Sequence, residues 1–296
     1  MRNQPVLCRL PPVLPALFVL AASIALASPA LAKVHLRIAA NSMIVDSFNL
    51  WNVATPWESI TSYGSPQANR PTVDLVLELQ ALKAGGLDFD FELVPTPNYE
   101  RAKLEVIEGH ADLTAETIWD DELAANAATL AKSDVILRNG DFEKGIYTLP
   151  TNTKLLSIHS IEELREYVGI TVGTWALDLK ALEAMQLKGV EKAPKAEAVF
   201  AMIAKQRADF SPMEFSSRPD MSNEMGGVRL VPVPNCKIAL AGSRSWGIGR
   251  SSPAAGEIEE ALRKGVAIMR ADGRIERAFK ESGFFSPRVA DWKRLN

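Results

Sequence analysis

Short apolar runs alternate with amphipathic helical patterns along most of this chain, and this alternation restricts the fold more than any other feature. Apolar runs at residues 34–40, 89–94, 111–118 and 169–173 are typical of buried strands, and helical patterns such as residues 72–82 and the alanine-rich 123–131 lie between them. Residues 46–71 are rich in aromatic residues and are expected to form a long irregular loop. Strands that alternate with helices form parallel sheets covered by helices. We therefore expect an α/β protein.

Two polar, glycine-bearing stretches divide this pattern. We interpret residues 138–145 and 240–245 as crossings between two lobes. Lobe one would hold residues 33–138 and 242–296, and lobe two residues 139–241, each a mostly parallel sheet flanked by helices. Ligands of open α/β sheets gather beyond the carboxyl ends of the strands. A ligand cleft is therefore expected between the lobes.

The first 32 residues have the pattern of an export signal. Arg2 and Arg9 precede an apolar run at residues 13–27, and Ala30-Leu31-Ala32 matches a small-residue cleavage site. We expect cleavage after Ala32 and a periplasmic protein; an uncleaved anchor is the alternative. Cleavage would remove Cys8 and leave Cys236 in an apolar run, where a buried side chain and no intramolecular disulfide are expected.

Charge and motifs exclude several function classes. The formal net charge of the 296-residue chain is −3, which argues against nucleic acid or an anionic membrane as a partner. The three histidines, His35, His110 and His159, lack metal-ligand spacing. The sequence has no Walker loop, no GxGxxG after a strand, no HExxH and no GxSxG. We expect no metal, no cofactor and no catalytic residue.

The stretch at residues 243–285 carries a specific resemblance. It reads as a strand at residues 246–249, a Ser-Ser-Pro turn, a long helix, Asp272-Gly273 and a short helix that ends at Gly283. This order resembles the closing module of the family 3 extracytoplasmic solute-binding proteins. The resemblance implies the two-lobed type II periplasmic-binding-protein fold. It also implies hinge closure over a small molecule, an ABC permease as partner and a monomer.

In lobe one, the resemblance places candidate ligand contacts after the third strand. Amino-acid-binding members of that family carry an arginine there, which pairs with the ligand carboxylate. This chain instead has acids and an aromatic residue, with Glu116, Thr117 and Trp119 as the candidates. The departure puts an ordinary α-amino-acid ligand in doubt.

In lobe two, Gly173-Thr174 matches the family's anion-binding helix start, and Glu214 matches the acid that faces a ligand ammonium. A plain helix cap for Thr174 and a surface carboxylate for Glu214 are the alternatives. Trp175 follows at a strand end and is expected to line the cleft.

Three further residues complete the candidate set. Trp51 and Trp57 could form cleft walls, although core packing explains them equally well. Arg101 matches a family arginine at a helix start near the cleft, with a surface salt bridge as the alternative.

The leading hypothesis is a solute-binding protein for a small polar, amino-acid-like metabolite. One alternative is an exported enzyme on the same fold, similar to the cyclohexadienyl-dehydratase-like lyases, with Glu116 or Glu214 as general acid. Another is a ligand-sensing partner of a signalling protein. Turnover of prephenate or arogenate would distinguish the enzyme from a binding protein.

Overall fold

The computed structural model describes Met1 and residues 33–296. The expected signal sequence, its cleavage site and Cys8 lie outside the described residues. Residues 33–296 form one compact unit. None of the described helices is long and apolar enough to cross a membrane.

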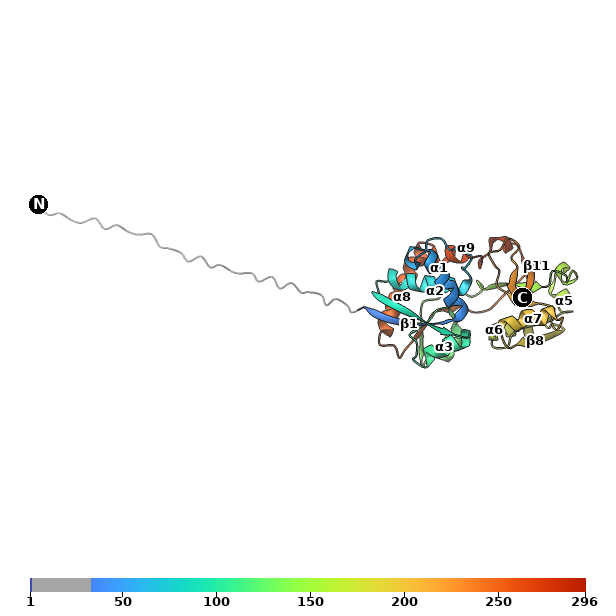
Figure 1. Ribbon diagram of the computed structural model, residues 1–296, viewed down its shortest axis with the longest axis horizontal. Coiled ribbons are helices and arrows are strands. Elements are labelled where there is room, and N and C mark those ends of the chain that lie inside the picture. The colour runs from blue at the N-terminus through green and yellow to red at the C-terminus, as the bar shows by residue number, and fades with distance from the viewer. Residues whose placement is uncertain (2–32) are drawn as a thin grey trace. The chain divides into compact units, whose positions relative to one another are not determined.

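The first sheet has five strands in the order β2-β1-β3-β13-β5. Its strands β1, β2 and β3 are parallel, and β13 runs antiparallel to its neighbours. The strands are β1 (Val34–Asn41), β2 (Phe89–Thr96), β3 (Leu113–Thr114), β5 (Leu130–Lys132) and β13 (Gly247–Gly249). The helices grouped with this sheet in Figure 1 are α1 (Ser42–Ala54), α2 (Arg70–Ala84), α3 (Tyr99–Ile107), α8 (Ala255–Ala271) and α9 (Arg274–Glu281).

The second sheet has the order β10-β11-β6-β9, and its pairs are antiparallel. Its strands are β6 (Glu143–Thr148), β9 (Ser211–Met213), β10 (Asn223–Met225) and β11 (Val228–Ala239). A parallel pair, β7 (Val168–Val172) and β8 (Gly189–Ala193), joins it through a bridge between Gly169 and Phe210. Helices α5 (Ile161–Leu164), α6 (Ala176–Ala184) and α7 (Ala196–Ala204) belong to this region. The expected mostly parallel arrangement is wrong for this sheet. The chain enters the second region along β6 and leaves it along β11, and these two central strands run in opposite directions.

The two predicted crossings lie side by side. Leu137 bridges to Arg244, and the Leu240 amide donates to the Phe142 carbonyl at 2.9 Å. The chain therefore passes between the sheets as a paired link. The predicted lobe boundaries stay a prediction, and β14 (Lys293–Arg294) pairs with β11 of the second sheet although residues 242–296 were assigned to lobe one.

Helix α2 forms the core of the first region. Asn69 caps it by accepting a hydrogen bond from the Thr72 amide at 3.1 Å, and its residues are buried from Arg70 to Leu82. Helix α8 packs against it at very short range. A Cβ on Gly265 would lie 1.9 Å from the Ala81 carbonyl oxygen, and one on Gly85 1.9 Å from that of Ala261.

Local structure differs from the sequence expectation in three places. Residues 46–71 were expected to be irregular, but α1 extends to Ala54 because Ile44, Phe48 and Trp51 form one buried face. The helix expected at 123–131 is shorter, since α4 (Asp120–Ala125) gives way to β5. The expected strand at 111–118 is split into β3 and β4 (Ile118–Trp119), which pairs with β12 (Arg244–Ser245). Cys236 is free and buried, as predicted.

Candidate functional site

A buried arginine at the start of α2 joins three carboxylates from different parts of the chain. Arg70 donates to Asp74 at 2.7 Å, one helical turn away, and to Glu116 at 3.0 Å in the loop between β3 and β4. Its Nε also donates, at 2.9 Å, to Glu214, the residue that follows β9 of the second sheet. Arg70 is 7% exposed. Its guanidinium therefore links the two sheet regions through an ion pair shielded from water.

A second buried arginine lies beside the same loop. Arg244 donates to the Thr117 hydroxyl at 3.0 Å and to the Thr117 carbonyl, and lies 3.9 Å from a Glu116 oxygen. It comes from β12, which pairs with Trp119 of β4. Its guanidinium lies 4.5 Å from the centre of the Trp119 ring, a cation–π distance.

A third buried cation comes from the second region. Lys144 of β6 pairs with Asp178 of α6 at 2.5 Å, and each side chain is 6% exposed. Its ammonium lies 5.2 Å from the centre of the Trp175 ring. Phe142 stands between all three cations, with its ring centre 5.4 Å from Arg70, 5.4 Å from Arg244 and 5.5 Å from Lys144. We call this set of three cations, their carboxylate partners and Phe142 the ion cluster.

The carboxylates of the ion cluster differ in pKa. Burial alone would raise the pKa of Glu214, but Arg70 and Lys144 outweigh that effect and lower it. Burial dominates for Glu116 and Asp74 and raises the pKa of both, although Arg70 and Arg244 oppose the change. The cluster thus combines one firmly ionised acid with two that protonate more readily.

Five of the sequence candidates belong to the ion cluster or contact it. The Thr117 amide and hydroxyl donate to Asp74 at 3.0 and 2.8 Å, which fixes the loop that carries the Glu116 carboxylate. The five candidates that the structure brings together are Glu116, Thr117, Trp119, Trp175 and Glu214.

The remaining candidates lie elsewhere or make no contact with the cluster. Thr174 is exposed and precedes Trp175, which occupies the N-cap of α6. Trp51 packs edge-on against Tyr63 in the first region. Trp57 contacts two rings of β2, and Arg101 pairs with Glu105 and Glu108.

Six residues of the ion cluster were not predicted from the sequence: Arg70, Asp74, Phe142, Lys144, Asp178 and Arg244. A signal existed for two of them. The apolar residues that follow Arg70 are interrupted by a few polar ones but occupy all sides of the helix, and a helix that is apolar all round is buried. Charged side chains inside such a helix must be buried as well and need partners. Arg244 falls in a stretch that was interpreted only as a crossing.

A shallow cavity of about 300 Å³ lies away from the ion cluster, with Trp57, Lys83 and Arg277 among its lining residues. Among its charged lining residues, Glu58, Lys83 and Arg277 are exposed and Arg274 is half-buried. Buried charges are costly and are retained where they have a use, so we take the ion cluster, and not this cavity, as the candidate site.

The fold is shared with solved two-lobed binding proteins. The probable amino-acid ABC transporter extracellular-binding protein YtmK of Bacillus subtilis is 14% identical, with 84% of this chain and 97% of that chain covered and a TM-score of 0.56. The VFT2 domain of the Bordetella pertussis BvgS periplasmic region is 17% identical over 84% and 93%, with a TM-score of 0.53. Substrate-binding domain 2 of Lactococcus lactis GlnP, in an open conformation, is 14% identical over 85% and 96%, with a TM-score of 0.50.

The expected two-lobed type II periplasmic-binding-protein fold is therefore confirmed. No family model matches the sequence, and no curated protein does. At these identities the likeness concerns the fold, and function has to be argued from the ion cluster.

Proposed function

We propose that this chain is an exported, monomeric solute-binding protein. It closes its two lobes over a small polar, amino-acid-like metabolite and delivers it to an ABC permease. The observation that carries the proposal is the ion pair from Arg70 of α2 to Glu214 beyond β9, because it spans the two sheet regions at the strand ends where ligands bind.

The charges of the ion cluster support a zwitterionic ligand. Arg70 and Arg244 would donate hydrogen bonds to a ligand carboxylate, and Glu214 and Glu116 would accept hydrogen bonds from a ligand ammonium. A zwitterionic ligand would replace each ion pair within the cluster by an ion pair between the protein and the ligand. No buried charge would then be left without an opposite charge beside it. A ligand of one charge would leave part of the cluster unpaired. Arg70 and Arg244 thus fill the role of the family arginine that the sequence after β3 lacks.

A thermal-shift screen of single compounds tests the proposal. L-amino acids should raise the melting temperature, whereas dicarboxylates and polyamines of similar size should have less effect. Stabilisation follows the ratio of ligand concentration to dissociation constant. If no compound of the amino-acid set stabilises the protein while a singly charged class does, the zwitterion hypothesis is wrong. Uptake of the hit by cells with and without the chain tests the importer role.

Glu214→Gln is the matching variant. It keeps the shape and removes a charge-assisted hydrogen bond, worth about 1.5–3 kcal/mol, so affinity for the screen hit should fall roughly ten- to a hundredfold. Glu224→Gln is the control, because Glu224 pairs with Arg218 at an exposed site of the second region. Calorimetry on both variants decides, and equal affinity in wild type and Glu214→Gln would remove Glu214 from the ligand site.

A lyase is the second candidate, and the raised pKa of Glu116 favours it. Burial holds this carboxyl more protonated than usual, which suits a general acid. Incubation with prephenate and arogenate should give product if the protein is an enzyme. If both substrates remain unchanged after prolonged incubation, the lyase candidate is rejected and the solute-binding function is retained.

A further inference from the structure

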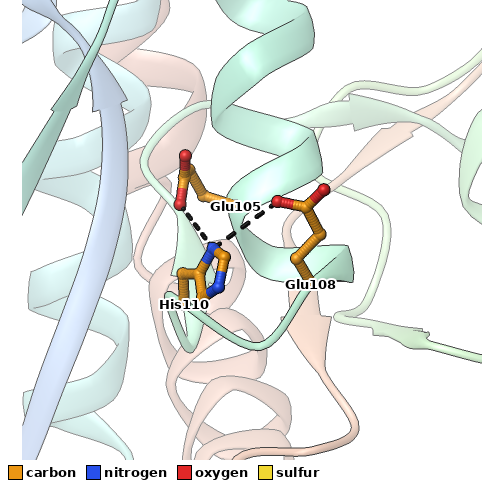
Figure 2. A group of neighbouring side chains, drawn as sticks. All are labelled: Glu105, Glu108 and His110. Carbon is orange, nitrogen blue, oxygen red and sulfur yellow. Dashed lines mark hydrogen bonds and ion pairs between the residues drawn. The ribbon is translucent and has the colours of Figure 1, made fainter.

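The C-terminal end of α3 carries three metal-type ligands on one side. Ligand atoms of Glu105, Glu108 and His110 all lie within 4.8 Å of one another. Figure 2 shows both carboxylates directed at the same nitrogen of the imidazole ring. The spacing between the three histidines gave no sign of this group, because its other two ligands are glutamates.

The distances between these ligand atoms suit a small divalent cation. His110 Nδ1 lies 3.0 Å from Glu105 Oε2 and 3.5 Å from Glu108 Oε2. Zinc bonds to nitrogen and oxygen of about 2.0–2.1 Å in a tetrahedron place neighbouring ligand atoms about 3.3–3.4 Å apart. The two distances from His110 Nδ1 to the glutamate oxygens are therefore already close to those required between neighbouring ligands of a tetrahedral zinc ion.

The backbone holds the three ligands in place. Gly109 has φ +80°, which turns the chain so that the His110 amide donates back to the Glu105 carbonyl at 2.8 Å. The Arg37 guanidinium also donates to the Gly109 carbonyl at 3.2 Å. The negative end of the α3 dipole lies at this end of the helix and favours a cation.

We propose that Glu105, Glu108 and His110 bind one divalent transition-metal ion such as Zn²⁺, with water completing the coordination. One nitrogen and two carboxylate ligands match the donor types that Zn²⁺ accepts. The site lies on α3, and no member of the ion cluster contributes a ligand to it. It is therefore independent of the proposed solute-binding function.

Arg101 already provides a positive charge at the same carboxylates. Its Nη2 lies 2.5 Å from Glu105 Oε1 and 3.3 Å from Glu108 Oε2. A metal ion must compete with this guanidinium. Removing the guanidinium should therefore strengthen metal binding, whereas a role limited to surface ion pairing predicts no metal effect at all.

Calorimetric titration of the protein, purified without a histidine tag, with ZnCl₂ tests the site. Wild type should bind one ion per chain at this site, and His110→Ala should weaken binding at least about tenfold. Arg101→Gln should tighten it roughly two- to fivefold, the size expected for an exposed charge pair. Zn²⁺ should also raise the melting temperature of wild type more than that of His110→Ala.

His35→Ala is the matched control. His35 also lies between two carboxylates, but Asp90 is 2.5 Å from its Nδ1 and Glu92 is 3.8 Å from its Nε2. Opposite ring nitrogens cannot direct both acids to one ion, so this variant should titrate as wild type does. The proposal is overturned if wild type takes up no Zn²⁺, if His110→Ala binds as wild type does, or if Arg101→Gln binds more weakly.

Discussion

One face of helix α2 carries three buried charged residues, and they differ in whether they have hydrogen-bond or ion-pair partners. Arg70, Asp74 and Glu78 are spaced by four residues and so lie along one side of the helix. At the first end, Arg70 and Asp74 have partners from other elements. One turn further, Glu78 is fully buried, and neither of its oxygens has a hydrogen-bond partner among the described residues.

The difference shows what decides the state of a buried acid. Burial raises the pKa of Glu78 well above its usual value, and the neighbouring Asp74 raises it further. Glu214 is opposed by Arg70 and Lys144, and its pKa is lowered. Glu78 therefore favours the neutral form in the fold and Glu214 the charged form, which gives the two acids opposite effects on stability as pH changes.

Among the substitutions that test this difference between buried acids, loss of Arg70 should change the free energy of unfolding most. Arg70→Met leaves Asp74, Glu116 and Glu214 without their shared cation, and removing one partner of a buried pair typically costs about 3–5 kcal/mol. Without Arg70, burial should raise the folded pKa values of all three acids further, although Arg244, Lys144 and the Thr117 hydrogen bonds still oppose this change. The loss in the free energy of unfolding should therefore grow between pH 5 and pH 8, as urea denaturation can measure.

Arg101→Met is the control for this experiment. Arg101 also pairs with two acids, but its side chain is 39% exposed. Exposed pairs are worth about 0–1 kcal/mol. Equal losses for Arg70→Met and Arg101→Met would show that burial does not make the Arg70 pairs special.

Replacement of Glu78 should have an intermediate effect of opposite sign. Glu78→Leu removes a buried carboxyl that has no hydrogen-bond partner within residues 33–296 and should raise the free energy of unfolding by about 1–3 kcal/mol. The folded pKa of Glu78 is raised, so wild type loses stability as pH rises above about 4.3, the unfolded value. The gain should therefore be larger at pH 8 than at pH 5. A loss that is independent of pH would mean that Glu78 has a stabilising partner.

Removal of one hydroxyl should have the smallest effect. Thr117→Val deletes a donor to Asp74 and an acceptor for Arg244, and a single such hydrogen bond contributes about 1 kcal/mol. Asp74 keeps Arg70 and the Thr117 amide. Chemical denaturation should show a modest loss, and a loss as large as that of Arg70→Met would make Thr117, and not Arg70, the centre of the cluster.

The sequence predicted the fold better than the site. Strands and helices were found because their periodicity is local, and β1 and α2 lie close to the predicted ranges. Helix α1 was missed because its aromatic residues, such as Phe48 and Trp51, were interpreted as part of a long loop. Five candidates belong to the ion cluster or contact it because they lie at strand ends or within a few residues beyond them, where the fold of the sheet places them.

The partners of those candidates depend on contacts between distant segments. Arg70 and Glu214 are 144 positions apart, and Arg244 and Thr117 are 127 apart. No local pattern connects such pairs, so the sequence does not show that Arg70 and Arg244 lie beside the loop after β3. The charges within the apolar run of α2 were the only local sign that ionic partners were required.

The close approach of α2 and α8 has a mechanical consequence. Gly85 and Gly265 leave no room for a side chain between each helix and the carbonyl of the other. The backbones of the two helices therefore lie against each other at two points, which limits how far α2 can move relative to α8. We expect release of Glu214 from Arg70 to involve displacement of the strand end that carries Glu214, or rotation of the arginine side chain, and not movement of α2.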